Sequence, residues 1–367
     1  MKFLQRLKAN LVKVTLIVVA TLLIVQYWPQ DAVDSPHRFE PLFLINSSRS
    51  KLGYLTENLT VLAIEEFQNG SYTLNSSSYS TPILTGIPTC PPIPPNLTGP
   101  IKIRVTFEKF SVIEKDFVDL EPGGIYRPKD CKARNVVALV IPYRDRPAQL
   151  AIFLNNIHRL LMKQQIDYRI FVIEQDGNGP FNRGKLLNVG FTEALKLRDF
   201  DCFIFHDVDL IPEDDRNLYT CPEQPRHMSV AVDKFHYALP YRDLFGGVCA
   251  FTTEHFKLTN GFSNVFWGWG GEDDDLYTRL RRKGLNVSRY PPTIARYTML
   301  PHAKQTPNPR RYEIMEKGRK TQNRDGLNSL SYNLKKFENK KLYTWILVEL
   351  KPPPKWWLMG LFRLWKS

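Results

Sequence analysis

The feature that most constrains the fold is a series of short, largely apolar segments that alternate with longer amphipathic ones after residue 135. Three of them, Val136–Pro142, Tyr168–Glu174 and Cys202–Phe205, have the composition of buried strands. Between them, Leu150–Leu161 and Lys185–Leu197 have the apolar spacing of helices. Short apolar strands joined by helices are typical of a parallel sheet covered on both faces. The sequence therefore predicts an α/β fold in which ligands bind at the carboxyl ends of the strands.

The N-terminus predicts a membrane anchor. Residues 14–28 carry no charge, and basic residues precede them. If Lys13 extends its ammonium group to the headgroups, the apolar length is about 18 residues, near the lower limit for crossing a bilayer. The positive-inside rule then places residues 1–13 in the cytosol and the rest outside it, as in a single-pass type II protein. A cleaved signal peptide is the alternative, but no small-residue cleavage site follows Trp28.

The region after the predicted anchor has the composition of a stem. Ser, Thr, Asn and Pro dominate it, no apolar period is visible, and most of the Asn-x-Ser/Thr sequons of the chain lie before residue 100. We expect a glycosylated, extended stem over residues 29–87 and a folded domain over residues 88–350. The sequons are at Asn46, Asn58, Asn69, Asn75, Asn96 and Asn286.

Glycosylation outside the cytosol implies an oxidising compartment, so the cysteines are candidates for disulfides. Four of them can pair, and one is left over. They are Cys90, Cys131, Cys202, Cys221 and Cys249.

The net charge of +13 does not indicate a nucleic-acid partner. The basic residues are spread along the chain, without zinc-finger spacing, an RNP-like signature or a long basic run. A basic surface suits a nucleotide diphosphate or anionic headgroups equally well.

The C-terminal residues 351–367 form a Trp-rich tail that is too short to span a bilayer. Such a tail would pack on the domain, insert at a membrane interface or dock on a membrane partner.

Asp207-Val208-Asp209 follows the third predicted strand. Carboxylates two residues apart in an extended chain point to the same side, so both would face the ligand cleft. A nucleotide diphosphate needs a hard divalent cation that bridges carboxylate and phosphate oxygens. The alternative is that these acids form a turn or cap a helix. The apolar strand before them and Leu210-Ile211-Pro212 after them favour a metal site.

Residues 267–275, Trp-Gly-Trp-Gly-Gly-Glu-Asp-Asp-Asp, combine glycines, aromatics and acids. Consecutive acids suit a helix N-terminus, where they face the positive end of the helix dipole. Glycines beside tryptophans predict a mobile loop whose ring closes over a ligand. The alternative, a capped helix with a packed tryptophan, leaves the glycines unexplained.

Met299 and His302 form a third element, three residues apart. A lone histidine is usually a hydrogen-bonded structural residue, and a thioether is a soft ligand for an oxygen-preferring ion. This spacing alone does not establish a metal site.

These elements together resemble the β1,4-galactosyltransferase family of inverting enzymes. The resemblance covers roughly residues 88 to 350 and implies a GT-A type fold, with a mixed, mostly parallel sheet, a nucleotide-binding half and an acceptor half. It also implies a Golgi membrane enzyme with a lumenal catalytic domain, a UDP-sugar donor and a terminal GlcNAc acceptor. The matching stretches are residues 181–190, 206–212, 245–247, 267–275 and 325–330.

The resemblance implies roles for individual residues. Mn²⁺ would be held by Asp209, Met299 and His302, and Asp273 would act as general base beside Glu272. The acceptor sugar would meet Gly271, Glu272, Asp273, Asp274 and Arg311. The donor would be bound by Pro142, Tyr143, Arg144, Asp145, Arg146, Phe181, Asn182, Arg183, Asp207, Val208, Leu244, Trp269 and Lys304. The disulfides would be Cys90–Cys131 and Cys202–Cys221, leaving Cys249 as a buried thiol.

Two positions depart from the vertebrate family pattern. Lys304 stands where those members carry Arg, so a bidentate phosphate contact becomes a point charge. Leu244 stands where galactose-transferring members carry Tyr, near carbon 2 of the donor sugar. A smaller aliphatic side chain leaves room for an N-acetyl group, as in invertebrate members that use UDP-N-acetylgalactosamine. We therefore predict transfer of GalNAc to GlcNAc; the alternative is that Leu244 is a neutral packing variant and galactose remains the donor.

A non-enzymatic Golgi lectin or helper subunit is a further alternative, which would be marked by a broken metal set or a missing base. The residues of the metal set and the base are all present in the sequence. A hydrolase is disfavoured because the chain has no G-x-S-x-G elbow.

Overall fold

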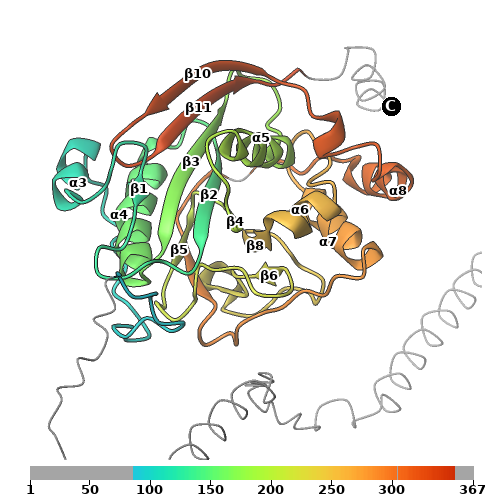
Figure 1. The fold of residues 1–367 in the computed structure, drawn as a ribbon. Coiled ribbons are helices and arrows are strands. Elements are labelled where there is room, and N and C mark those ends of the chain that lie inside the picture. The colour runs from blue at the N-terminus through green and yellow to red at the C-terminus, as the bar shows by residue number, and fades with distance from the viewer. Residues whose placement is uncertain (1–85, 304, 352–367) are drawn as a thin grey trace, which may run out of the picture. The chain divides into compact units, whose positions relative to one another are not determined.

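The computed structural model describes residues 86–303 and 305–351 of the protein (Figure 1). The predicted cytosolic tail and anchor, nearly all of the predicted stem and all but Lys351 of the Trp-rich tail lie outside the described residues. Within the described ranges, no helix has both the length and the apolar character that a membrane span requires.

A mixed sheet of eight strands forms the centre of the described domain, and the middle of this sheet is parallel. The parallel strands are β2 (Val136–Tyr143), β3 (Asp167–Gln175), β4 (Cys202–His206) and β11 (Thr344–Glu349). The antiparallel strands are β1 (Ile125–Tyr126) on β3, β6 (Arg226–His227) on β8, β8 (Val248–Thr252) on β4 and β10 (Asn333–Asn339) on β11. The predicted α/β class is confirmed, with antiparallel strands added outside the parallel centre.

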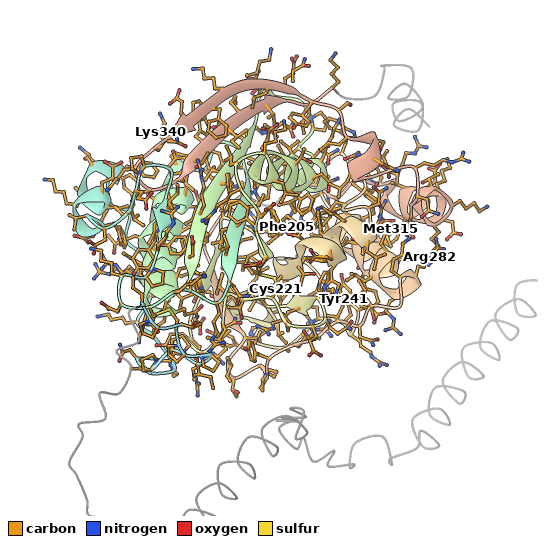
Figure 2. All side chains as sticks on the ribbon, viewed as in Figure 1. Phe205, Cys221, Tyr241, Arg282, Met315 and Lys340 are labelled. Carbon is orange, nitrogen blue, oxygen red and sulfur yellow. A yellow bond between two sulfur atoms is a disulfide. The ribbon has the colours of Figure 1, made fainter. Side chains whose placement is uncertain are left out.

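Helices cover both faces of this sheet because alternate residues of a strand point to opposite sides. On β2, Leu139 packs in one hydrophobic cluster with α4 (Pro147–Lys163), and Val140 packs in the other with α5 (Arg183–Leu195). A Cβ atom at Gly190 would lie 2.2 Å from Cγ1 of Val140, so the glycine lets α5 approach the sheet closely. Figure 2 shows Phe205 of β4 among the packed interior side chains and Lys340 at the periphery.

A second sheet has three strands in the spatial order β5-β9-β7, and its first strand, β5, directly follows β4 in the chain. Its strands are β5 (Leu210–Pro212), β7 (Ala231–Val232) and β9 (Arg296–Met299). The remaining helices are α3 (Phe110–Asp116), α6 (Thr253–Leu258), α7 (Glu272–Arg282) and α8 (Arg311–Thr321), with short 3-10 turns η2 (Asp233–Phe235) and η3 (Leu327–Ser329).

Residues 101–105 have a strand-like sequence, but the structure has no strand there. The backbone N–H of Ile101 donates to the carbonyl of Glu213 at 2.8 Å, and that of Arg104 donates to Oδ1 of Asn156 at 2.8 Å. These amides bond to a loop carbonyl and a side chain, so the segment joins no sheet.

Candidate active site

The Asp-x-Asp segment connects the central sheet to the small one. β4 ends at His206 and β5 begins at Leu210, whose N–H donates to the carbonyl of Asp207 at 3.3 Å. The segment is therefore a turn and not the extended chain that the sequence led us to expect. The turn still brings the carboxylates of Asp207 and Asp209 close enough to influence each other electrostatically.

Each carboxylate of this turn has its own arginine. Arg183 donates to Oδ1 of Asp207 at 2.6 Å, and Arg146 donates to Oδ2 of Asp209 at 2.8 Å. Asp209 is only 6% exposed. Burial and then the charge of Asp207 raise the pKa of Asp209, and Arg146 and His302 oppose that rise. The turn thus concentrates negative charge where water cannot screen it well.

Of the predicted metal ligands, Asp209 and His302 come together, and Met299 lies on the neighbouring strand β9. Met299 lies directly opposite Leu210 across the β5–β9 pair, and Nε2 of His302 lies 3.4 Å from Oδ2 of Asp209. Nδ1 of His302 lies 2.9 Å from the carbonyl of Ala303, so a proton on Nδ1 leaves the Nε2 lone pair facing the carboxylate. Two electron-rich atoms so placed repel each other unless a cation lies between them.

The donor set therefore fits a divalent cation. Across residues 86–303 and 305–351, no three His, Cys, Asp or Glu side chains gather into a metal site, and Met299, on the strand beside Asp209, is the candidate third ligand that the family resemblance implies.

The residues expected to bind the donor cluster where β2 and β3 end. β2 ends at Tyr143, and the chain turns through Asp145, which has a φ of 49°, into α4. Arg144 donates to the carbonyl of Gly179 at 2.7 Å and stacks over the ring of Phe181 at 5.3 Å. Two further residues of the set have structural contacts. Pro142 pairs with Ile173 across β2–β3, and the side chain of Asn182 caps α5 by accepting from the N–H of Lys185. Lys304 lies outside the described residues.

A second group of acids begins α7, as predicted. Gly271 is the N-cap, with a φ of 96°, and the first turn carries four acids with different surroundings. Asp275 is buried and pairs with Arg279 at 2.6 Å, which makes it structural. Asp274 accepts a hydrogen bond from the hydroxyl of Tyr241 at 2.9 Å. No sequence pattern pointed to Tyr241, because a single aromatic residue in a loop has no pattern.

Glu272 and Asp273 are the titratable pair of this turn. Glu272 lies 3.6 Å from Arg183, the residue that also binds Asp207. Burial and then the charge of Asp273 raise the pKa of Glu272 to about 7. Burial and then the charge of Asp274 raise the pKa of Asp273. A carboxylate of raised pKa is a better proton acceptor, as a general base must be.

The loop before α7 carries an exposed aromatic ring. Trp269 is 53% exposed, and the glycines on both sides of it have positive φ values. Its carbonyl accepts from the N–H of Asn308 at 3.0 Å, so the loop is joined to the segment after His302. Arg311 lies 5.9 Å from the Trp269 ring, which brings the expected acceptor residue to the same place.

Leu244 lies in the loop before β8, and this loop touches the acids of α7. A Cβ atom at Gly246 would lie 2.4 Å from Oδ2 of Asp273, so the backbone two residues after Leu244 packs against that carboxylate. Leu244 is itself partly buried.

The structure has both disulfides that the family resemblance implies, Cys90–Cys131 and Cys202–Cys221, and Cys249 is a buried free thiol. Of the sequon asparagines, Asn96 and Asn286 are exposed, and the other four lie outside the described residues.

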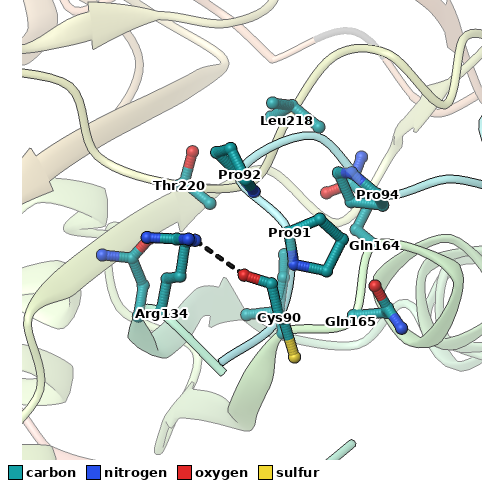
Figure 3. Close-up of a pocket in the computed structure, with 11 residues that line it drawn as sticks. Cys90, Pro91, Pro92, Pro94, Arg134, Gln164, Gln165, Leu218 and Thr220 are labelled. Atoms are coloured by element: carbon teal, nitrogen blue, oxygen red, sulfur yellow. Dashed lines mark hydrogen bonds between the residues drawn. The ribbon is translucent and has the colours of Figure 1, made fainter. Parts of the chain in front are cut away.

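A cavity of about 40 Å³ beside Cys90 is lined by prolines, Arg134 and Gln164 (Figure 3). None of the acids described above lines it, so it belongs to the fold of the N-terminal segment and not to the active site.

Comparison with known proteins agrees with this geometry. Residues 90–222 match the N-terminal region of glycosyl transferase group 7, and residues 226–303 match the N-terminal domain of galactosyltransferase. The chain is 46% identical over 286 residues to β-1,4-galactosyltransferase 1 of Mus musculus, covering 76% of this chain and 72% of that protein. It is 43% identical over 279 residues to β-1,4-galactosyltransferase 3 of Bos taurus, covering 75% and 70%.

Two solved structures are also similar. The catalytic domain of Drosophila β1,4-galactosyltransferase 7 in complex with xylobiose is 30% identical, with a TM-score of 0.52, over 59% of this chain and 95% of that one. A mutant of the same enzyme in complex with manganese, UDP-Gal and xylobiose is 29% identical, with a TM-score of 0.50, over the same shares.

The fold and the acids gathered at its strand ends define a metal-dependent glycosyltransferase of the class that uses nucleotide-sugar donors. The sequence matches have enough identity and coverage to identify the family within this class. The chain belongs to the β1,4-galactosyltransferase family of inverting hexosyltransferases.

Proposed function

We propose that the protein transfers GalNAc from UDP-GalNAc to the 4-hydroxyl of a terminal β-GlcNAc, with inversion at the anomeric carbon. The observation that carries this proposal is Leu244, which stands where galactose-transferring members have Tyr. Its loop packs against Asp273 through Gly246, which supports a position for residue 244 near the reacting sugar. Replacing an aromatic ring with an aliphatic side chain frees the volume that a 2-acetamido group needs.

Asp209, Met299 and His302 would hold Mn²⁺, the metal that accompanies UDP-Gal in the complex of the Drosophila enzyme. When bound, Mn²⁺ acts as a Lewis acid that neutralises charge on the departing UDP. Arg146 and Arg183 supply fixed positive charge at the same edge of the sheet. Such preorganised charges stabilise a leaving diphosphate without reorganisation during the reaction.

Asp273 would accept the proton of the acceptor 4-hydroxyl. The hydroxyl oxygen forms its bond to the anomeric carbon as the bond from that carbon to UDP breaks, and a single displacement inverts the configuration. The raised pKa of Asp273 supports this role. A positioned base of this kind contributes about 10²–10⁴-fold to the rate.

The Trp269 loop would exclude water from the loaded site. Trp269 and Asn308 are joined through their backbones, so the loop and the segment after His302 would close as one unit. Closure protects the donor from hydrolysis and completes the acceptor site.

Galactose transfer from UDP-Gal is the second candidate, because the similar proteins are named galactosyltransferases. Initial rates with UDP-GalNAc and UDP-Gal at equal concentration, with and without Mn²⁺, distinguish the two. We expect a clear preference for UDP-GalNAc in the native enzyme, and Leu244→Tyr to move the preference towards UDP-Gal. A native preference for UDP-Gal would exclude the GalNAc assignment.

We also propose that residues 14–28 anchor the enzyme in the Golgi membrane, with the catalytic domain in the lumen. Replacing residues 1–28 with a cleavable signal sequence should release active enzyme into the medium.

The Trp-rich tail would contact the membrane or a membrane partner, and truncation after Pro354 should alter localisation or activity. If neither changes, the tail has no such role.

A further inference from the structure

The loop that carries Leu244 is attached to α7 on one side. The hydroxyl of Tyr241 donates to Asp274 at 2.9 Å, and Gly246 lies against Asp273. This side of the loop is therefore fixed by the helix that carries the catalytic acids.

On the other side, the side chains of His227 and Arg289 hold three carbonyls of the loop. Nη2 of Arg289 donates to the carbonyl of Arg242 at 2.9 Å and to that of Leu244 at 2.8 Å. Nε of Arg289 donates to Nδ1 of His227 at 3.2 Å, and Nε2 of the same imidazole lies 3.1 Å from the carbonyl of Gly246. One guanidinium therefore holds the carbonyls of residues 242 and 244 directly and that of residue 246 through His227.

These contacts leave the backbone of Leu244 little freedom. Its N–H donates to the carbonyl of Tyr241 at 3.2 Å, and its own carbonyl is held by Arg289. With both peptide groups fixed, the position of the Leu244 Cα atom, from which its side chain projects, depends on the position of the guanidinium. A displacement of about 1 Å at such a place is enough to change a rate up to 100-fold.

We infer that Arg289 is a positioning residue for donor selection, which acts by fixing the carbonyls of residues 242 and 244 and so the depth of the donor pocket at Leu244. This inference rests on the proposed function, in which residue 244 faces the 2-substituent of the donor sugar. Lysine cannot substitute for Arg289, because an ammonium group is a point charge and lacks the planar fork that reaches the carbonyls and His227 together.

The test measures initial rates with UDP-GalNAc and UDP-Gal in the native enzyme and in the variants Arg289→Lys, Arg289→Ala and Leu244→Tyr. Lys283→Ala is the matched control, since Lys283 is an exposed cation at the end of α7. The readout is the ratio of the two rates within one preparation. Because both donors share the same active molecules, partial misfolding cancels from this ratio.

We expect Arg289→Lys to lower the ratio of UDP-GalNAc to UDP-Gal rates about 3- to 10-fold, Arg289→Ala to lower it at least as far, and Lys283→Ala to leave it unchanged. If both Arg289 variants slow the two donors by the same factor while Leu244→Tyr shifts the ratio, the role of Arg289 is merely structural and the inference fails alone. If Leu244→Tyr also leaves the ratio unchanged, the proposed donor assignment fails with it.

Discussion

The acids that follow β4 and the acids that begin α7 lie on either side of Arg183, and their surroundings differ. Asp207 and Asp209 occupy a turn in which each carboxylate meets a guanidinium, and Nε2 of His302 lies 3.4 Å from Oδ2 of Asp209. Glu272 and Asp273 share only the more distant charge of Arg183 and stand at a helix N-terminus. The first group attracts the positive charge that a diphosphate requires, and the surroundings of the second group raise the pKa of its carboxylates.

Arg183 connects the two groups. Burial lowers its pKa, but the charges of Asp207 and Glu272 more than offset this and raise it. A permanently charged guanidinium between the two groups reduces the repulsion between their carboxylates and helps both to be buried near each other.

The largest expected effect follows from removing the cation site. Asp209→Asn keeps the shape of the side chain but removes its charge, and we expect transfer to fall about 10³-fold or more, because a metal contributes several kcal/mol and each 1.36 kcal/mol is a factor of ten. Rates over a range of Mn²⁺ concentrations, with the thermal midpoint as a folding control, measure this. A variant with the native rate and native Mn²⁺ dependence would remove Asp209 from the cation site.

The next effect is on the proton acceptor. Asp273→Asn should lower kcat about 10²–10⁴-fold while leaving the dependence on Mn²⁺ unchanged. Asp274→Asn is the matched control in the same helical turn. Since Asp274 is bonded to Tyr241, its replacement should raise the KM for GlcNAc more than it lowers kcat. Equal losses of kcat in both variants would contradict a distinct role for Asp273.

The pH dependence of the transfer rate tests the carboxylates at the start of α7. The base acts in its ionised form, and burial raises the pKa of Asp273, so activity is lost as pH falls through that raised value. The acid limb of the kcat/KM profile should therefore lie above the ordinary aspartate pKa of about 3.9. Asp274→Asn should move this limb to lower pH, because the negative charge that raises the pKa of Asp273 is gone. An unmoved limb would show that the two carboxylates do not titrate as a pair.

The smallest effect is on stability. The pKa of the Glu272 carboxyl is about 7 in the folded protein, whereas its ordinary value is 4.5. The contribution of this group to the free energy of unfolding is therefore fully present below pH 4.5 and is lost as pH rises through 7. Glu272→Gln should therefore stabilise the protein at pH 8 relative to pH 5 by about 1–3 kcal/mol. Urea unfolding of both proteins at the two pH values measures this. The same stability difference at both values would contradict the assignment.

Much of this organisation could be predicted from the sequence. The apolar strands that end at Pro142 and Phe205 predicted the parallel centre, and the four consecutive acids predicted a helix start at residue 272. The turn at residues 207–209 could not be told from an extended segment, because both use the same residues and only the hydrogen bond from Leu210 distinguishes them. The backbone contacts of Arg289 were also hidden, since carbonyl acceptors leave no trace in a side-chain pattern.

The most direct test of the division between the two groups is calorimetric binding of UDP in the presence of Mn²⁺ to Asp209→Asn and Asp273→Asn, both shown to be folded. The account predicts that Asp273→Asn binds UDP with native affinity, whereas Asp209→Asn binds it at least about tenfold more weakly. If the two variants bind UDP and Mn²⁺ equally well, or if Asp273→Asn is the weaker, the two acidic groups do not have the separate roles assigned to them.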